Sequence, residues 1–240
     1  MTEIVEAAVA GSVEQRDRWP EMHCSCPSRI IAAAAVAAAL VFIPTASWSQ
    51  PAPLVLCGPG GPPPGQAPSE RDIQLDAQRQ SLGHVLVCPE NLSRFDYAAS
   101  AQPLAGVLPR LSFRPTELAR TAFSWLEPIG AAGDYWSGDG KAAGLHRTFR
   151  TPSGIVIDLL EWDMGTSGSV SIAPERLTER VKGFPAQLLI LKSTSGPAVS
   201  LLQWVAARRY YELTISIDIR LLTTTPTLWE LAESVPAPGR

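Results

Sequence analysis

Residues 144–162 read GLHRTFRTPSGIVIDLLEW, and this stretch predicts a β-hairpin. Residues 144–150 and 155–162 have the composition of strands, and they flank Thr151-Pro152-Ser153-Gly154, a sequence typical of a hairpin turn. Strand signals dominate the chain from this point onward. The stretch therefore favours a domain built on a sheet.

Further strands and helices are predicted on both sides of this hairpin. Strand patterns occur at residues 84–87, 169–173, 187–192, 199–205 and 210–217. Helical patterns occur at residues 70–82, 116–126, 174–182 and 227–235. Neighbouring strands with helices at the ends are typical of an α+β domain. We expect one such domain over residues 70–240, with an antiparallel sheet of about five or six strands, an N-terminal helix and a closing C-terminal helix.

Two segments predict which side chains are buried. Residues 210–217 alternate as a strand does, so the core is expected to receive Tyr211, Leu213, Ile215 and Ile217. The opposite side would face water with Tyr210, Glu212, Thr214 and Ser216. The helix at 227–235 would bury a stripe of Leu228, Leu231, Ala232 and Val235. Core packing is also expected of Trp125, Trp162, Trp204 and Trp229.

The N-terminal part of the chain predicts export. Residues 30–43, IIAAAAVAAALVFI, form an uncharged run of 14 residues, which matches the apolar region of a secretory signal. Ser47 and Ser49 supply the small residues that a signal peptidase accepts, which places cleavage near Ser49-Gln50. The alternative is an uncleaved membrane anchor over residues 30–48, but the run is shorter than the roughly 17–25 residues of a spanning helix.

Residues 1–21 differ from a signal sequence, because they carry five acidic and two basic residues. We expect this segment to be disordered or to precede the true start at Met22, so that residues 22–49 form the signal peptide. Residues 50–69 form a predicted linker rich in proline and glycine, the composition of a solvated spacer.

The cysteines support the same compartment. Cys24 and Cys26 lie in the predicted signal, so we do not assign them to a metal site with His23. Cys57 and Cys88 would remain in the mature chain and are predicted to form a disulfide, with two free buried thiols as the alternative. Of the 20 basic residues 17 are arginine, a bias typical of GC-rich bacterial genomes. Export would then mean the periplasm or the outside of the cell.

The C-terminal quarter shows one family resemblance. It rests on Gly183-Phe184-Pro185-Ala186, on a strand pair with Trp204 and Tyr211, and on Leu228 followed by Leu231-Ala232-Glu233-Ser234. This pattern resembles small uncharacterised extracytoplasmic bacterial domains, some of which occur in regulatory or anti-sigma-type proteins. The resemblance implies a sheet-based domain outside the cytoplasm, and it assigns no catalytic residue.

The segment 134–140, DYWSGDG, is the leading candidate for ligand binding. Asp134, Tyr135, Trp136 and Asp139 place two aromatic rings and two carboxylates in a predicted flexible loop. Aromatic faces stack on ligands and carboxylates accept hydrogen bonds, so the segment suits a sugar or a peptide. The alternative is a loop whose rings cap the core.

Catalytic motifs are sparse. His146 with Asp158 or Glu161 is the one arrangement that could serve a hydrolase. We expect instead that His146 is a surface residue, and that Asp158, Glu161 and Asp163 form a solvated acidic face. Arg208 and Arg209 are expected to be solvated in a hairpin turn.

Composition narrows the functional classes. The chain holds 20 basic and 23 acidic residues, a net charge of −3, which argues against nucleic-acid binding. We expect no metal or cofactor, and a membrane contact only through the signal segment. The sequence favours an exported binding or interaction module for a cell-envelope ligand or protein, rather than an enzyme. The alternatives are a cell-envelope hydrolase that uses His146 and a membrane-tethered sensor with residues 30–48 as its anchor.

Overall fold

The computed structural model describes residues 52–57, 69–165, 172, 174–222 and 227–237. The chain divides into two units, Met1–Ser49 and Gln50–Arg240, and every described residue belongs to the second. The predicted signal segment, most of the predicted linker and all but Ile172 of the predicted strand 169–173 lie outside the described residues. Within the described ranges, no helix is long and apolar enough to cross a membrane.

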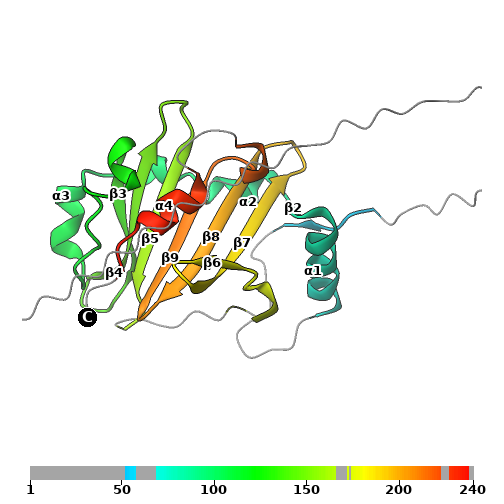
Figure 1. Cartoon of the computed structure of the whole chain (residues 1–240), viewed down its shortest axis with the longest axis horizontal. Helices are drawn as coiled ribbons and strands as arrows, with labels where there is room; N and C mark the ends of the chain where they lie inside the picture. Colours follow the sequence, from blue (N-terminus) through cyan, green and yellow to red (C-terminus); the bar gives the residue numbers. More distant parts are fainter. Residues whose placement is uncertain (1–51, 58–68, 166–171, 173, 223–226, 238–240) are drawn as a thin grey trace, which may run out of the picture. The chain divides into compact units, whose positions relative to one another are not determined.

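The fold is α+β, as predicted, but its sheet has nine strands rather than five or six. The strand order is β1-β2-β7-β8-β9-β5-β4-β3, and β6 pairs with β7 (Figure 1). The β1–β2 and β2–β7 pairs are parallel, and the other pairs are antiparallel. The strands are β1 (Val55–Leu56), β2 (Val85–Val87), β3 (Glu127–Trp136), β4 (Ala142–Arg150), β5 (Val156–Asp163), β6 (Glu179–Val181), β7 (Phe184–Ser193), β8 (Ala198–Ala206) and β9 (Arg209–Ile215).

The hairpin predicted at residues 144–162 is confirmed as β4 and β5. Its register places Gly144 opposite Trp162 and Arg150 opposite Val156. The Thr151 amide donates to the Ile155 carbonyl at 2.9 Å, and Gly154 adopts a φ of 86° that glycine tolerates without strain. The turn chemistry read from the sequence therefore closes this hairpin.

The helices are short, and two of them begin with a capping box. The helix α1 (Glu70–Leu82) begins with a capping box between Ser69 and Asp72, and α4 (Leu228–Ser234) with one between Thr227 and Glu230. Both helices were predicted. The remaining helical segments are α2 (Pro89–Ser93), α3 (Leu104–Val107) and the 3-10 turns η1 (Tyr97–Ser100), η2 (Leu108–Arg110), η3 (Ala122–Trp125), η4 (Pro174–Arg176) and η5 (Ile219–Leu221).

Two predicted helices are wrong. Residues 116–126 contain only the turn η3, because the backbone of Thr116 is bound by side chains from the sheet rather than by a helical neighbour. Residues 174–182 form η4 and then β6, which pairs with β7. Trp125 is also misplaced by the prediction, since 81% of its surface is exposed. Trp162 and Trp204 are buried as expected, and Trp229 packs against the core.

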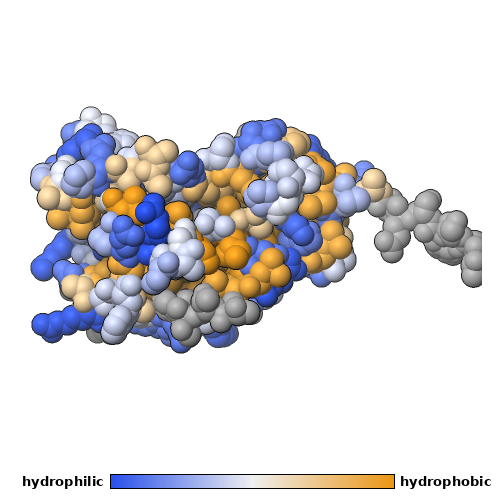
Figure 2. Space-filling view, turned by 90° about the horizontal axis from the view of Figure 1, so that it is seen from above, coloured by the Kyte–Doolittle hydropathy of each residue, from blue (hydrophilic) through white to orange (hydrophobic). Residues whose placement is uncertain are grey.

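One face of the sheet, which we call the helix face, lies beneath α4 and forms the main core (Figure 1). Its central side chains are Ile157, Leu159, Leu202, Leu213 and Ile215. The helix contributes Leu228, Leu231 and Ala232, all fully buried, and Val235 follows them. The predicted stripe of α4 is therefore confirmed. A band of hydrophobic residues also crosses the middle of the view from above (Figure 2).

The opposite face, which we call the polar face, carries His146, Asp158, Leu160, Gln203 and Glu212. It was expected to meet water at Tyr210 and Thr214, and this expectation is wrong because both are buried. Tyr210 packs with Leu160, Trp162 and Val205 on this face. Beside them, Tyr97 of η1 stacks on the imidazole of His146.

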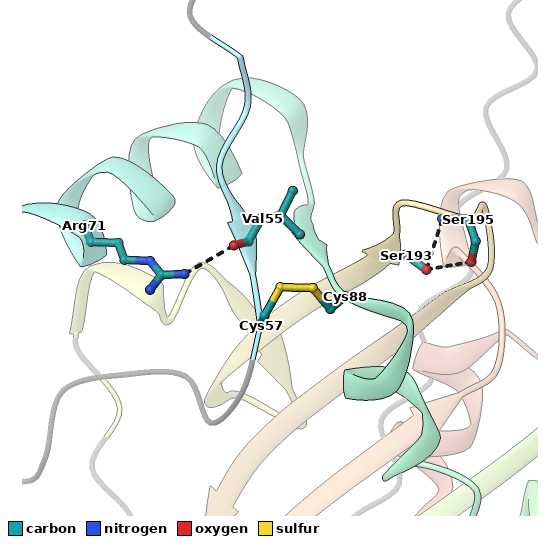
Figure 3. The surroundings of a disulfide bond; sticks show 6 residues. All are labelled: Val55, Cys57, Arg71, Cys88, Ser193 and Ser195. Carbon is teal, nitrogen blue, oxygen red and sulfur yellow. Dashed lines mark hydrogen bonds between the residues drawn. A yellow bond between two sulfur atoms is a disulfide. The ribbon is translucent and has the colours of Figure 1, made fainter.

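The predicted disulfide between Cys57 and Cys88 is present (Figure 3). It ties the end of β1 to the start of α2 across a separation of 31 residues. The Cys88 amide also donates to the Leu56 carbonyl at 3.0 Å, and Arg71 of α1 donates to the Val55 carbonyl. The bond therefore secures the short parallel edge of the sheet, where backbone pairing alone is limited to two or three residues per strand.

Candidate functional site

A pocket of about 370 Å³ opens on the polar face. The sheet supplies its floor, and the segment between α2 and η1 supplies one wall. Its lining residues are Arg94, Phe95, Tyr97, Asp134, Tyr135, His146, Leu160, Leu189, Leu191, Leu201, Gln203 and Glu212. Polar and aromatic groups thus meet a patch of leucines in one concave site.

The strand register aligns the polar groups of this pocket. His146 on β4 lies opposite Leu160 on β5, which lies opposite Glu212 on β9, which in turn lies opposite Gln203 on β8. These four side chains therefore form one row across four strands, because residues in register share a face. Asp134 on β3 extends the row at the His146 end.

His146 is held between two carboxylates. Its Nδ1 lies 2.6 Å from Asp158 Oδ2, and its Nε2 lies 3.4 Å from Asp134 Oδ2. Burial disfavours the imidazolium, but the hydrogen bonds to Asp134 and Asp158 outweigh that effect and raise the pKa of His146 to about 9. The hydrogen bond from His146 lowers the pKa of Asp134. His146 is therefore a cation at neutral pH that donates to both carboxylates, and the expectation of a surface histidine is wrong.

The expected solvated acidic face is also wrong for two of its three members. Asp158 is buried on the polar face, where its second oxygen accepts a 2.8 Å hydrogen bond from the Thr148 hydroxyl. Glu161 is fully buried on the helix face. Asp163 is half-buried and accepts from the Gly165 amide in the turn that follows β5.

Glu161 is surrounded by donors that fill its hydrogen-bonding capacity. It accepts from the amide and the hydroxyl of Thr116, from Arg147 at 2.9 Å and from Arg209. Arg147 also donates to the Thr116 carbonyl, and burial lowers the pKa of its guanidinium. This cluster anchors an irregular segment to the sheet. The expectation that Arg209 is solvated is therefore wrong. Glu161 and His146 lie on opposite faces of the sheet.

The four residues of the predicted ligand loop separate into two groups. Asp134 and Tyr135 line the pocket, although they belong to β3 rather than to a loop. Trp136 instead lies under the guanidinium of Arg110, and Asp139 is exposed in the following turn, where it accepts from Ser137 and from the Lys141 amide. The structure therefore brings together only half of the predicted set.

Tyr135 reaches the pocket through an unusual backbone conformation. Its φ is 52°, in the left-handed region that non-glycine residues rarely adopt. The ring lies over Gly144, where a Cβ atom would approach the Tyr135 Cδ2 atom to 2.6 Å, and stacks on Trp162 at 4.2 Å. Gly144 thus leaves the space that Tyr135 occupies. Strain of this kind in a non-glycine residue is typical of functional sites.

Sequence reasoning missed Tyr97, Arg94, Gln203 and Glu212 as pocket residues. Glu212 accepts from the Gln203 amide at 2.7 Å and from the Tyr210 hydroxyl at 2.9 Å, while its other oxygen has only a 3.4 Å contact with Thr214. The alternation of β9 placed Glu212 on the correct side. The alternation does not show that segment 94–97 covers this side of the sheet and forms a wall of the pocket.

Among its described lining residues, the pocket offers no serine, threonine or cysteine nucleophile beside His146. While His146 is protonated, it cannot accept a proton and cannot act as a general base. The sulfur atoms of Cys57 and Cys88 lie within 4.8 Å of a Glu90 carboxylate oxygen, but they are joined in the disulfide and do not offer thiolate ligands.

Comparison of the chain with family models, with curated proteins and with solved structures finds no match. The resemblance of the C-terminal quarter to extracytoplasmic domains stays a prediction.

The pKa of His146 implies a loss of stability in alkaline solution. The unfolded imidazole has a pKa near 6.5 and the folded one about 9. The folded state therefore holds its proton more tightly, and the stabilisation is complete below pH 6.5 and falls as the pH rises toward 9. We expect a loss of about 3 kcal/mol in the free energy of unfolding over this range. Urea unfolding at a series of pH values measures it.

The matched variants are His146→Gln and His84→Gln. The first should remove the alkaline loss, and the second should retain it. Parallel curves for the wild type and His146→Gln would contradict the assignment of the proton to His146.

The Glu161 cluster gives a second expectation. Glu161→Gln leaves Arg147 and Arg209 without their buried counter-charge, so we expect the free energy of unfolding to fall by about 3–5 kcal/mol. Glu127→Gln is the matched control, because the Glu127 side chain is 68% exposed and lies 3.9 Å from Arg150. That change should have little effect. Equal effects of the two substitutions in denaturant titrations would show that the cluster does not anchor the fold.

Proposed function

We propose that the protein is an exported binding module that holds a small cell-envelope ligand in the pocket of the polar face. The observation that carries the proposal is the convergence of Asp134, Glu212, Tyr97 and Tyr135 on one cavity of about 370 Å³. Small-molecule sites are commonly concave, largely preformed and lined by apolar groups with a few placed polar ones.

The contrast with the Glu161 cluster supports this interpretation. Around Glu161, hydrogen-bond donors from three residues surround the carboxylate, and its function is structural. On the polar face, the row of charged side chains instead borders a cavity, and one oxygen of Glu212 has only a long contact. Charged groups held at the wall of a cavity are already oriented for a ligand.

Rigid strands hold these groups in place. His146, Glu212 and Gln203 stand on the central strands β4, β9 and β8, each paired on both sides. Hydrogen bonds to neighbouring side chains fix the orientation of His146 and Glu212. Binding then costs little ordering of the protein, which favours affinity for a small ligand.

Export is supported by two features. Residues 30–43 match the apolar part of a secretory signal, with cleavage proposed near Ser49-Gln50. The disulfide between Cys57 and Cys88 is a bond that persists mainly in oxidising compartments. Together they favour the periplasm or the cell exterior, and therefore an envelope ligand.

A ligand screen followed by NMR tests the function. The full chain is titrated with monosaccharides, amino acids and short peptides, and resonances are followed at Trp162, which stacks on Tyr135. A ligand of this site should shift them, and Asp134→Asn and Glu212→Gln should weaken binding by about tenfold each.

The control Asp139→Asn separates the pocket from the loop that the sequence suggested. Asp139 lies outside the pocket lining, so binding should persist in this variant. A ligand that loses affinity with Asp139→Asn but not with Glu212→Gln would overturn the assignment to the polar face.

A further inference from the structure

We infer that the ligand of this pocket is a short peptide with free ends, held by its ammonium group at Glu212 and by its carboxylate at Arg94. The inference rests on the proposed function. It follows from the charges at the two ends of the pocket and from the apolar surface between them.

The end of the pocket near β3 and β9 is negative. Asp134 and Asp158 flank the cation His146, and Glu212 adds a third carboxylate two strands away. The row therefore keeps an excess of negative charge next to a cavity. A cationic group of a ligand would compensate that charge and would take the weakly bonded oxygen of Glu212.

Aromatic rings strengthen the preference for a cation. Tyr97 and Tyr135 line the same end, and the faces of such rings attract ammonium groups. The pKa of each phenol is raised, first by burial and then by nearby carboxylates that include Asp134 and Glu212. The carboxylates thus impose a negative potential at both rings.

The other end of the pocket is positive. Arg94 lies against the Phe95 ring and, within the described part of the chain, forms no ion pair. It also lines a neighbouring pocket of about 210 Å³, which Arg79 and Arg176 border together with Asp72 and Asp76. Arg79 and Arg176 pair with Asp76, so Arg94 is the arginine left to bind an anion.

The distance between the two ends fits a peptide of about three residues. Glu212 stands on β9, whereas Leu189 and Leu191, which line both pockets together with Arg94, stand on β7. One strand lies between β9 and β7, so Glu212 is about 10 Å from these leucines beside Arg94, the span of three extended residues. Leu189, Leu191 and Leu201 form an apolar floor between them, which suits a small apolar side chain.

The experiment compares one peptide in three chemical forms. Calorimetric titration of the full chain uses Ala-Leu-Ala with free ends, its N-acetyl form and its C-terminal amide. We expect acetylation and amidation each to weaken binding by about tenfold or more, because each removes one charged contact. This arm needs no variant, so it does not depend on the folding of a mutant.

Two variants assign each end of the peptide. Glu212→Gln should weaken binding of the free peptide but leave binding of the N-acetyl form unchanged. Arg94→Gln should weaken binding of the free peptide but leave binding of the C-terminal amide unchanged. Equal binding of all three forms would overturn the inference. So would binding of N-acetylglucosamine in the pocket without binding of any peptide, a result that would preserve the proposed function. If no probe of the wider screen shifts the Trp162 resonances, the proposed function itself fails.

Discussion

The register of the hairpin formed by β4 and β5 is the constraint on which both charged clusters depend. Side chains of a strand alternate between the two faces, so a slip of one residue would exchange them. With His146 opposite Leu160, the imidazole meets Asp158 on the polar face, and Arg147 meets Glu161 on the helix face. A slipped register would leave these buried charges without partners, which costs several kcal/mol per ion. The two clusters therefore stabilise the pairing that creates them.

The two clusters contain similar residues, but their surroundings differ. The Glu161 carboxylate is enclosed by hydrogen-bond donors and ties the segment around Thr116 to the sheet. Its oxygens are therefore not available to a ligand. The row that begins at His146 includes the half-buried Gln203 and Glu212 and borders a cavity, because Tyr97 covers only part of the polar face. One face of the sheet is thus covered by α4, and the other is only partly covered by an irregular segment and borders the pocket.

Local signals in the sequence predict much of the fold. The caps at Ser69 and Thr227, the turn after Arg150 and the alternation of β9 lie within a few residues of what they determine, and the predicted elements there are confirmed. The strand β3 was missed because its glycines and alanines carry little strand propensity, and its pairing depends on β4. The pocket was half predicted: Asp134 and Tyr135 stood out by composition, but Tyr97 covers His146 from 49 positions away. The hairpin strands carry His146, Arg147, Asp158 and Glu161, but the prediction from sequence placed the histidine at the surface and both carboxylates in solvent.

The charge state of His146 is the most direct test of this account, because it reports the contacts on both sides of the ring. Long-range proton–nitrogen NMR spectra of the full chain resolve the two ring nitrogens of each histidine. With His146 between Asp134 and Asp158, both of its nitrogens should carry protons at pH 7.5 and lose the cationic signature only near pH 9. A neutral imidazole at pH 7.5 would contradict the placement of His146 between Asp134 and Asp158. It would also leave His146 able to act as a base in the hydrolase alternative.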